Sequence, residues 1–144
     1  MPDELDVDRL AMVVEDFNTI FIRLPSVRRY NFSTLSVLHT LGRNGPLRLT
    51  DLLPTEQLKQ PALTALVARL EEDGLIQRRP DPNDGRATLL SLTRAGKQIV
   101  RSRHAERVKK LSRLVDQLTP EERAVLADSV HVLTRLTEIA ADTT

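Results

Sequence analysis

The chain has 144 residues, no cysteine, and 21 basic against 20 acidic side chains, for a net charge of +1. The absence of cysteine excludes disulfides and thiolate metal sites within the chain, and favours a reducing, intracellular setting. No apolar run approaches the roughly 18 residues of a membrane-spanning helix, and the acidic N-terminal segment lacks the pattern of a signal peptide. We therefore expect one cytoplasmic domain with extended helices and no membrane contact.

The charges are distributed unevenly along the chain. Residues 1–22 have a net charge of −5, residues 23–113 have +10, and residues 114–144 have −4. A basic middle between acidic ends is typical of a chain that binds a polyanion through its central segment. The alternative is an ordinary solvated surface of mixed charge.

The N-terminal half begins with three predicted helices. Residues 5–24 carry apolar side chains at helical spacing until a proline ends the pattern. Ser33 is a suitable cap for a second helix, which Gly42 and the following Asn44-Gly45-Pro46 terminate, and Thr50 is a suitable cap for a short third helix. Pro54 falls in the first turn of this third helix, which is therefore either distorted or begins nearer the proline.

A fourth helix is predicted from Gln60–Pro61, because proline is favoured at the first helical position, to Gly74. One face should contact the core and carries Leu63, Leu66, Val67 and Leu70. The opposite face carries small or polar residues, namely Ala62, Thr64, Ala65, Ala68, Arg69 and Glu72. Small side chains there would let the helix approach the edges of DNA bases, whereas the alternative is an ordinary solvent-facing helix.

Two short apolar runs follow, Leu75–Ile76 and Leu89–Leu92, on either side of a turn-rich tip at residues 81–86 that carries the cation Arg86. This pattern predicts a β-hairpin, and Asp84–Gly85 is itself a hairpin-turn pair. A short helix followed by such a hairpin is the arrangement of a winged helix-turn-helix. In that arrangement one basic element suits the major groove of DNA, and the other suits the backbone or minor groove.

Two long helices complete the chain. Thr93 is a suitable cap for the first, from about residue 94 to 118. We favour a solvated face over a second DNA surface for its basic flank, residues 101–113. Thr119–Glu122 is a capping box for the last helix. The apolar residues of that helix spread around most of its circumference, so we expect another copy of the chain to cover them.

Residues 47–96 resemble the multiple antibiotic resistance regulator (MarR) family of transcription factors. The family pattern D-x-R-A-x-x-x-x-L-T-x-x-G is matched by Asp84, Arg86, Ala87, Leu92, Thr93 and Gly96. The preceding helix matches through Leu63–Thr64, Leu70–Glu71, Gly74–Ile76 and Arg78. The resemblance implies a mainly α fold with a small β-hairpin wing, in a single chain of residues 1–144. Its winged helix-turn-helix would lie at residues 31–92, and helical dimerisation segments at 1–30 and 93–144.

The resemblance also implies a function. A homodimer would present one winged helix-turn-helix per subunit to a pseudo-palindromic operator and regulate transcription, as a repressor in the simplest case. The recognition helix would contact DNA through Gln60, Pro61, Thr64, Ala65 and Arg69. Arg86 would enter the minor groove, oriented by an ion pair with Asp84. The residues alone leave an alternative to DNA contact for each arginine. Arg86 would be a solvated hairpin residue, and Arg69 would form an ion pair with Glu72.

Members of this family respond to small, often phenolic or lipophilic ligands in a cleft between the two regions, so the resemblance implies such an effector. The candidate site is the grouping of Phe17, Phe21, Tyr30, Phe32 and His39, for which core packing is the favoured alternative. The three histidines lie on separate elements, which disfavours a metal site. No sequence motif suggests an enzyme or a cofactor. A winged helix that serves only protein–protein contacts is the remaining alternative.

Overall fold

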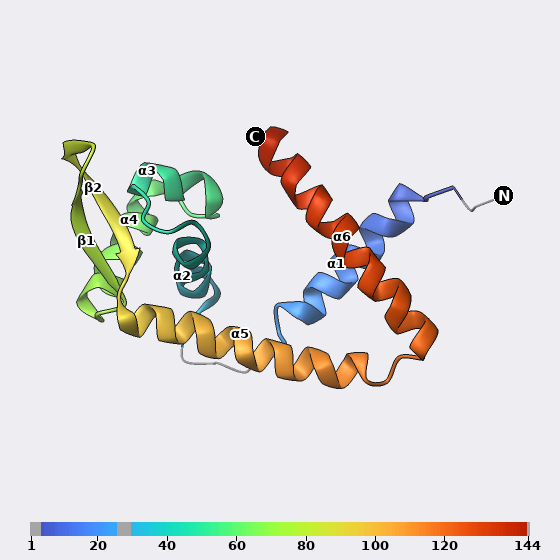
Figure 1. Ribbon diagram of the computed structural model, residues 1–144. Helices are drawn as coiled ribbons and strands as arrows, with labels where there is room; N and C mark the ends of the chain where they lie inside the picture. Colours follow the sequence, from blue (N-terminus) through green and yellow to red (C-terminus); the bar gives the residue numbers. More distant parts are fainter. Residues whose placement is uncertain (1–3, 26–29, 144) are drawn as a thin grey trace. The chain divides into compact units, whose positions relative to one another are not determined.

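The computed structural model describes residues 4–25 and 30–143. Within these residues the helices and strands are α1 (Val7–Phe21), α2 (Phe32–Asn44), α3 (Leu49–Leu52), the 3-10 helix η1 (Leu53–Thr55), α4 (Gln60–Glu72), β1 (Ile76–Asp81), β2 (Asp84–Leu92), α5 (Arg94–Val115) and α6 (Pro120–Thr143) (Figure 1). Contacts divide the chain into two compact units, Met1–Arg107 and Val108–Thr144, with the boundary inside α5. The predicted fold class, mainly α with one small hairpin, is confirmed.

Helix α1 is shorter than the predicted residues 5–24. Asp6 begins it, because the Asp6 carboxylate accepts a hydrogen bond from the backbone N–H of Arg9 at 3.1 Å. The apolar stripe that the spacing predicted is present, but no residue of α1 is buried. In the single chain, this stripe is therefore accessible to solvent or to a partner.

Helix α2 is capped by Asn31 and not by Ser33, so the predicted cap is wrong. The Asn31 side chain accepts a hydrogen bond from the backbone N–H of Thr34 at 2.9 Å. Asparagine and serine cap helices about equally well, and the sequence alone did not separate them. The helix also continues through Gly42 and ends at Gly45, whose φ of 73° lies in the left-handed region that glycine adopts without strain.

The segment between α2 and α4 is fastened to α2 by a buried carboxylate. Helix α3 begins after Arg48, so the predicted cap at Thr50 is wrong, and the distortion expected at Pro54 is the change from α to 3-10 geometry. Glu56 follows η1 and is buried. Its carboxylate accepts hydrogen bonds from the Ser36 hydroxyl at 2.5 Å and the Thr40 hydroxyl at 2.9 Å. These bonds fix the start of α4 relative to α2.

Helix α4 has the bounds and the buried face that its sequence predicts. It begins at Gln60, carries Pro61 in its first turn, and is followed by Gly74 with a φ of 74°. The predicted core residues Leu63, Leu66, Val67 and Leu70 are all buried. They pack with apolar residues of α2, α3 and the hairpin: Val37, Leu38, Leu41, Leu52, Leu75, Ile76, Leu90 and Leu92.

Strands β1 and β2 pair antiparallel, and the register shifts at the tip. There Asp81 pairs with Asp84, so residues 85–87 bulge out of β2. The turn itself is Pro82–Asn83, and not the Asp84–Gly85 pair that the sequence suggested. The bulge follows the turn directly and gives this part of the wing an irregular backbone.

Two sets of hydrogen bonds attach the base of the hairpin to neighbouring segments. Leu47, just before α3, forms backbone hydrogen bonds of 3.0 and 2.7 Å with Leu90 of β2. Thr93 caps α5 as predicted, because its hydroxyl oxygen accepts a hydrogen bond from the Gly96 N–H at 3.1 Å. The same hydroxyl donates to the carbonyl of Gly74 at 2.5 Å. The wing is thereby tied both to the segment before α3 and to the end of α4.

Helix α5 ends at Val115 rather than Leu118, and α6 begins with the predicted capping box. The Thr119 N–H donates to the Glu122 carboxylate at 2.9 Å, and the Glu122 N–H donates to the Thr119 hydroxyl at 3.2 Å. No residue of α6 is buried, and its large apolar side chains are 43% to 66% exposed. Within residues 4–25 and 30–143, no helix is long and apolar enough to cross a membrane.

Candidate nucleic-acid interface

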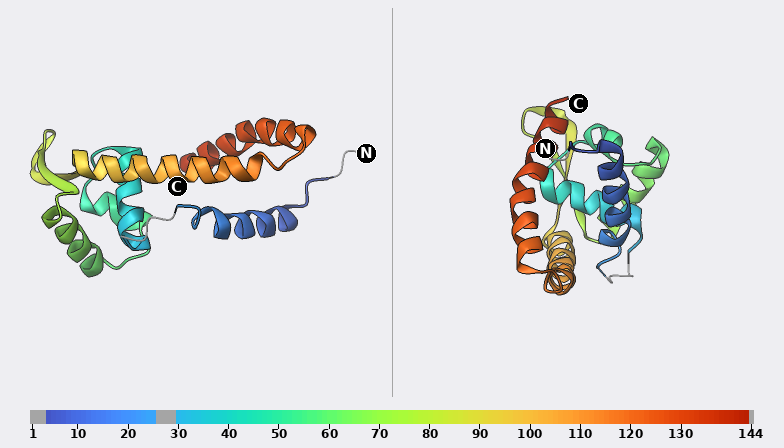
Figure 2. Two further views of the ribbon diagram at one scale, coloured as in Figure 1. Left: turned by 90° about the horizontal axis from the view of Figure 1, so that it is seen from below. Right: turned by 90° about the vertical axis from the view of Figure 1, so that its right-hand side faces the viewer.

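One face of α4 is presented to solvent along the whole helix. Gln60, Pro61, Thr64, Ala65 and Arg69 all lie on this face and are exposed, while the opposite face lies in the core. Figure 2 shows α4, in green, at the edge of its unit beside the hairpin. The structure thus brings together the five residues predicted for the recognition helix. Small side chains near an exposed helix N-terminus leave backbone N–H groups accessible to phosphate oxygens and base edges.

At the C-terminal end of α4, Glu71 rather than Glu72 forms an ion pair. Its partner is Arg78 of β1, at 3.0 Å. Arg69 has no ion pair within the part of the chain that the structure describes, so the predicted Glu72 alternative is not formed. Arg69 lines a cavity of about 420 Å³ that also includes Tyr30. A guanidinium in this position can donate to a phosphate without first breaking an internal ion pair.

Arg86 is exposed on the bulged part of β2, next to the turn. The Asp84 carboxylate accepts a hydrogen bond from the backbone N–H of Arg86 at 3.1 Å. Among the described residues, no ion pair joins the Asp84 carboxylate to the Arg86 guanidinium. Asp84 therefore orders the backbone that carries Arg86, and does not orient its side chain as the resemblance implied.

An ion pair that sequence reasoning missed holds the tip of the wing. The Arg48 guanidinium donates to one carboxylate oxygen of Asp81, through Nε at 3.1 Å and Nη2 at 2.6 Å. The other Asp81 oxygen accepts from the Asn83 N–H at 2.9 Å. The Asn83 hydrogen bond first, and the Arg48 guanidinium second, hold the pKa of Asp81 below its ordinary value. Because the two residues are 33 positions apart, no local pattern could have indicated this pair.

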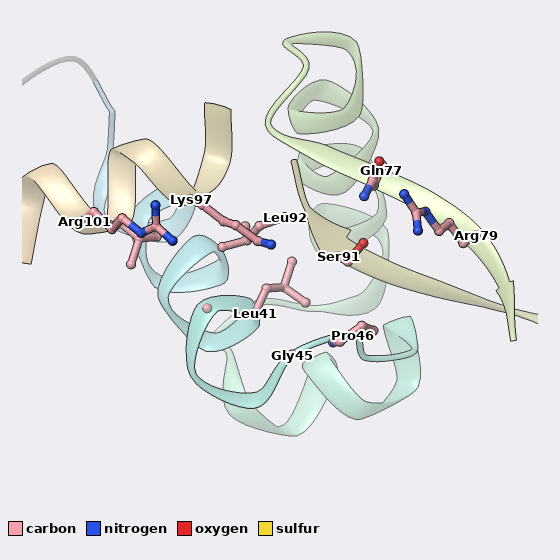
Figure 3. Close-up of a pocket in the computed structure, with 11 residues that line it drawn as sticks. Leu41, Gly45, Pro46, Gln77, Arg79, Ser91, Leu92, Lys97 and Arg101 are labelled. Atoms are coloured by element: carbon pink, nitrogen blue, oxygen red, sulfur yellow. The ribbon is translucent and has the colours of Figure 1, made fainter. Parts of the chain in front are cut away.

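A cavity of about 620 Å³ lies between the end of α2, the outer face of the hairpin and the start of α5. Its floor includes Leu41 and Leu92, and cations from two elements, Arg79, Lys97 and Arg101, surround it. Figure 3 shows the end groups of Arg79 and Lys97 on opposite sides of the opening. None of the described residues that line the cavity is acidic. Its electrostatics favour an anionic group, such as a phosphate or a carboxylate.

The five aromatic and histidine residues predicted for an effector site do not line one cavity. Phe17 and Phe21 stack on α1 with ring centroids 5.9 Å apart. Tyr30 lies beside Arg69, and Phe32 is 66% exposed next to a different cavity. None of the five is among the fully buried core residues, but Tyr30 is partly buried and packs against the core cluster, so the alternative interpretation as core holds only in part and only for Tyr30.

His39 and Phe21 come together around Arg107. The Arg107 guanidinium lies 4.6 Å from the centroid of the Phe21 ring. Burial first, then the positive charges of Arg107 and Arg103, lower the pKa of His39. Within the described residues, three buried nitrogens have no hydrogen-bond partner, namely His39 Nε2, Arg103 Nε and Arg107 Nε. The two guanidinium Nε–H groups are donors of the kind that an anionic group can satisfy.

The basic flank of α5 is therefore not uniformly solvated. Arg101, Lys109 and Arg113 are exposed, but Arg103 is buried and Arg107 is half-buried. Burial lowers the pKa of both of these arginines. The prediction of a solvated face is wrong for this pair, because tertiary packing covers both side chains, with Phe21 of α1 against Arg107, and the charge pattern alone gives no signal of that packing.

Comparison with known proteins places these features in a family context. The sequence model of the MarR family matches residues 31–88. The HTH-type transcriptional regulator Mb0904 of Mycobacterium bovis is 27% identical over 139 residues, which are 92% of this chain and 97% of that protein. A transcriptional regulator from Pseudomonas aeruginosa PA01, with a solved structure, is 30% identical with a TM-score of 0.75, and the match covers 92% of this chain and 94% of that one. The regulator Tm0710 of Thermotoga maritima shares the fold, with a TM-score of 0.80 at 23% identity and coverage of 95% and 99%.

Proposed function

Because this chain belongs to the MarR family of DNA-binding transcriptional regulators, we propose that it is a homodimeric repressor that reads a pseudo-palindromic operator. The observation that carries the proposal is the exposed, small-residue face of α4 beside an exposed cation at the wing tip. One such pair of elements suits one half-site. A transcriptional regulator must reach chromosomal DNA, which in bacteria lies in the cytoplasm. We therefore expect this protein to act in the cytoplasm.

In the proposed complex, α4 lies in the major groove. Thr64 and Ala65 approach base edges closely because their side chains are short, while Arg69 contacts a phosphate. The wing lies along the adjacent minor groove, where Arg86 meets the negative potential of a narrow groove. Phosphate contacts supply most of the affinity and make it fall with salt, and the contacts of α4 supply the sequence preference.

The proposed dimer rests on apolar surface that the single chain leaves open. On α1 the exposed residues include Val13 at 56% and Phe17 at 48%, and on α6 they include Val125 at 66% and Leu136 at 50%. Exposed apolar side chains in such number along two helices are unusual for a monomer and typical of a subunit interface. A second copy of the chain is the partner that would also match a symmetric operator. Repression then follows when the bound dimer blocks access to a promoter.

We further propose that a phenolic or lipophilic weak acid releases the operator. Of the residues expected for this site, Phe21 and His39 remain the best candidates, together with Arg103 and Arg107. The unpartnered nitrogens of this group support an anionic head, and the Phe21 ring supports an apolar body. Salicylate is a simple first probe, and Arg107→Gln should weaken its binding. A ligand that binds free and operator-bound protein equally well is not an effector, because it cannot shift the equilibrium between them.

The test of DNA reading starts with fragments that the purified protein selects from a random pool. Fluorescence anisotropy then compares the selected operator with a scrambled duplex. Thr64→Asp places a carboxylate against the major groove and should abolish operator binding more than non-specific binding. Ser102→Asp makes the same charge change at an exposed position of α5 and is the matched control. If no sequence is enriched, or if Thr64→Asp binds the operator like the parent protein, the proposal is wrong, and a role in protein–protein contacts becomes the better interpretation.

A further inference from the structure

The ion pair between Arg48 and Asp81 joins the tip of the wing to the segment directly before α3. Arg48 lies directly before α3, and Asp81 is the last residue of β1. Asp81 is only 7% exposed, although it lies at the tip of a hairpin. Two donors of one guanidinium meet the same carboxylate oxygen, so the pair restrains direction as well as distance.

The pair holds the wing at the point where its backbone becomes irregular. Near the base, the Leu47–Leu90 bridge already ties the hairpin to the segment before α3. Beyond that bridge the strands pair only with each other, and the register shifts between Pro80 and Asp81. The other Asp81 oxygen organises the turn through the Asn83 N–H. Asp81 therefore shapes the turn and anchors it to α3 with one carboxylate.

We propose that Arg48 and Asp81 are positioning residues, which hold the wing tip at a fixed offset from the recognition helix and so set operator specificity. This inference rests on the proposed function. An operator is read well only if the wing and α4 reach their grooves at the same time. A wing that swings freely can still find phosphates, but it meets the correct groove position only part of the time.

Two simpler roles give different expectations. If Asp81 acts only through its charge, removing that charge beside a polyanion should strengthen binding to every duplex. If Arg48 acts only as a phosphate contact, Arg48→Lys should bind nearly as well as the parent. The positioning role instead predicts weaker operator binding for both variants, with non-specific binding unchanged or stronger. The sign of the effect of Asp81→Asn therefore separates the roles.

The control is the ion pair between Glu71 and Arg78, which joins α4 to β1. Both of its side chains are 42% exposed, and it lies away from the turn. Glu71→Gln makes the same change of charge as Asp81→Asn, also by replacing a carboxylate with an amide. We expect about tenfold weaker operator binding for Asp81→Asn, the size of losing one groove contact. For Glu71→Gln we expect a change of less than about twofold, as for most exposed pairs.

A second measurement reports on the wing without DNA. The chain has no cysteine, so a nitroxide on Asn83→Cys labels the turn alone. The side chain of Asn83 is exposed, and the bond to Asp81 uses its backbone N–H, so the label leaves that bond in place. Adding Asp81→Asn or Arg48→Met should sharpen the electron paramagnetic resonance spectrum, whereas adding Glu71→Gln should leave it unchanged.

The outcomes are distinct. Loss of specificity together with a more mobile turn supports the positioning role, and Arg48→Met gives the same test if Asp81→Asn does not fold. Operator binding by a folded Asp81→Asn dimer that equals or exceeds the parent value overturns it. A spectrum that stays as broad as that of the labelled parent also overturns it. If the parent protein itself selects no DNA sequence, the proposed function fails, while the spectrum still shows whether the pair holds the wing.

Discussion

Alanine at Gly96 and alanine at Gly42 should change stability in opposite directions, although both glycines lie in helices. A Cβ atom at Gly96 would lie 2.2 Å from the carbonyl oxygen of Leu75. That oxygen is held in place, because it accepts a hydrogen bond from the Thr93 N–H at 3.1 Å. At Gly42 the nearest atom to an added Cβ is a methyl carbon of Val100 at 3.4 Å, which is close to an ordinary contact.

The magnitudes follow from two opposing terms. Alanine in place of glycine inside a helix contributes up to about 1 kcal/mol of stability. At Gly42 this term has little to oppose it, so we expect a gain of roughly 0.5–1 kcal/mol. At Gly96 the start of α5 must move away from the end of α4 by about 1 Å, and overpacking of this kind costs typically 1–3 kcal/mol. Since Gly96 is near the helix end, the gain is small there, and we expect a net loss of roughly 2 kcal/mol.

Thermal unfolding of both variants at one fixed protein concentration measures this difference. A loss of roughly 2 kcal/mol in a chain of this size lowers the midpoint by about 6 °C. The concentration must be equal because association shifts the apparent stability. The reasoning is refuted if Gly96→Ala is as stable as the parent protein, or if Gly42→Ala is the more damaging of the two. The result would also give a physical reason for glycine at the end of the L-T-x-x-G pattern.

Three further predictions concern the reader, the dimer and the buried histidine. Arg86→Ala should weaken operator binding by roughly 1–3 kcal/mol and keep stability within about 0.5 kcal/mol; anisotropy titrations at two salt concentrations check this, and unchanged affinity would contradict it. Leu136→Glu should shift sedimentation equilibrium toward monomer and weaken operator binding together, whereas a parent protein that is strictly monomeric would remove the symmetric model. The unfolded chain takes up a proton at His39 near the ordinary pKa of 6.5, but burial and then Arg107 lower the pKa in the folded chain. The free energy of unfolding should therefore fall between about pH 7 and pH 5, and a matching fall in His39→Gln would show that another group is responsible.

The elements that the sequence predicted well are those fixed by local rules. Helix α4 has a proline in its first turn, a regular apolar face, and a glycine with positive φ after its end. Each of these features depends on residues within a few positions of one another, and all three indicate the same helix. The capping box at Thr119 and Glu122 is equally local, and both of its hydrogen bonds are present. The exposed face of α4 follows from the buried one, so the candidate reading residues were predictable as well.

The misses arise where two local signals compete or where the partner is distant. Asn31 and Ser33 are both good caps, and only the packing of α2 decides between them. Pro82–Asn83 and Asp84–Gly85 are both good turns, and the register of the strands decides. Arg103 has the sequence pattern of a surface cation, and only the tertiary structure shows that it is buried. Such residues are assigned by tertiary contacts, which neither periodicity nor charge counts contain.

Buried residues are distributed unevenly between the DNA-binding elements and the terminal helices α1 and α6. Every residue of the apolar core cluster lies between Val37 and Leu92, so α2, α3, α4 and the hairpin share one hydrophobic core. Helices α1 and α6 contribute no buried residue. A helix of this length is marginal in water when its apolar face has nothing to pack against, because most helical stability in proteins comes from that packing. In the proposed homodimer, the terminal helices would acquire this packing from the partner subunit. The distance between the two winged helix-turn-helix units would then be fixed only in the dimer. Any ligand that alters the packing of these helices would alter that distance.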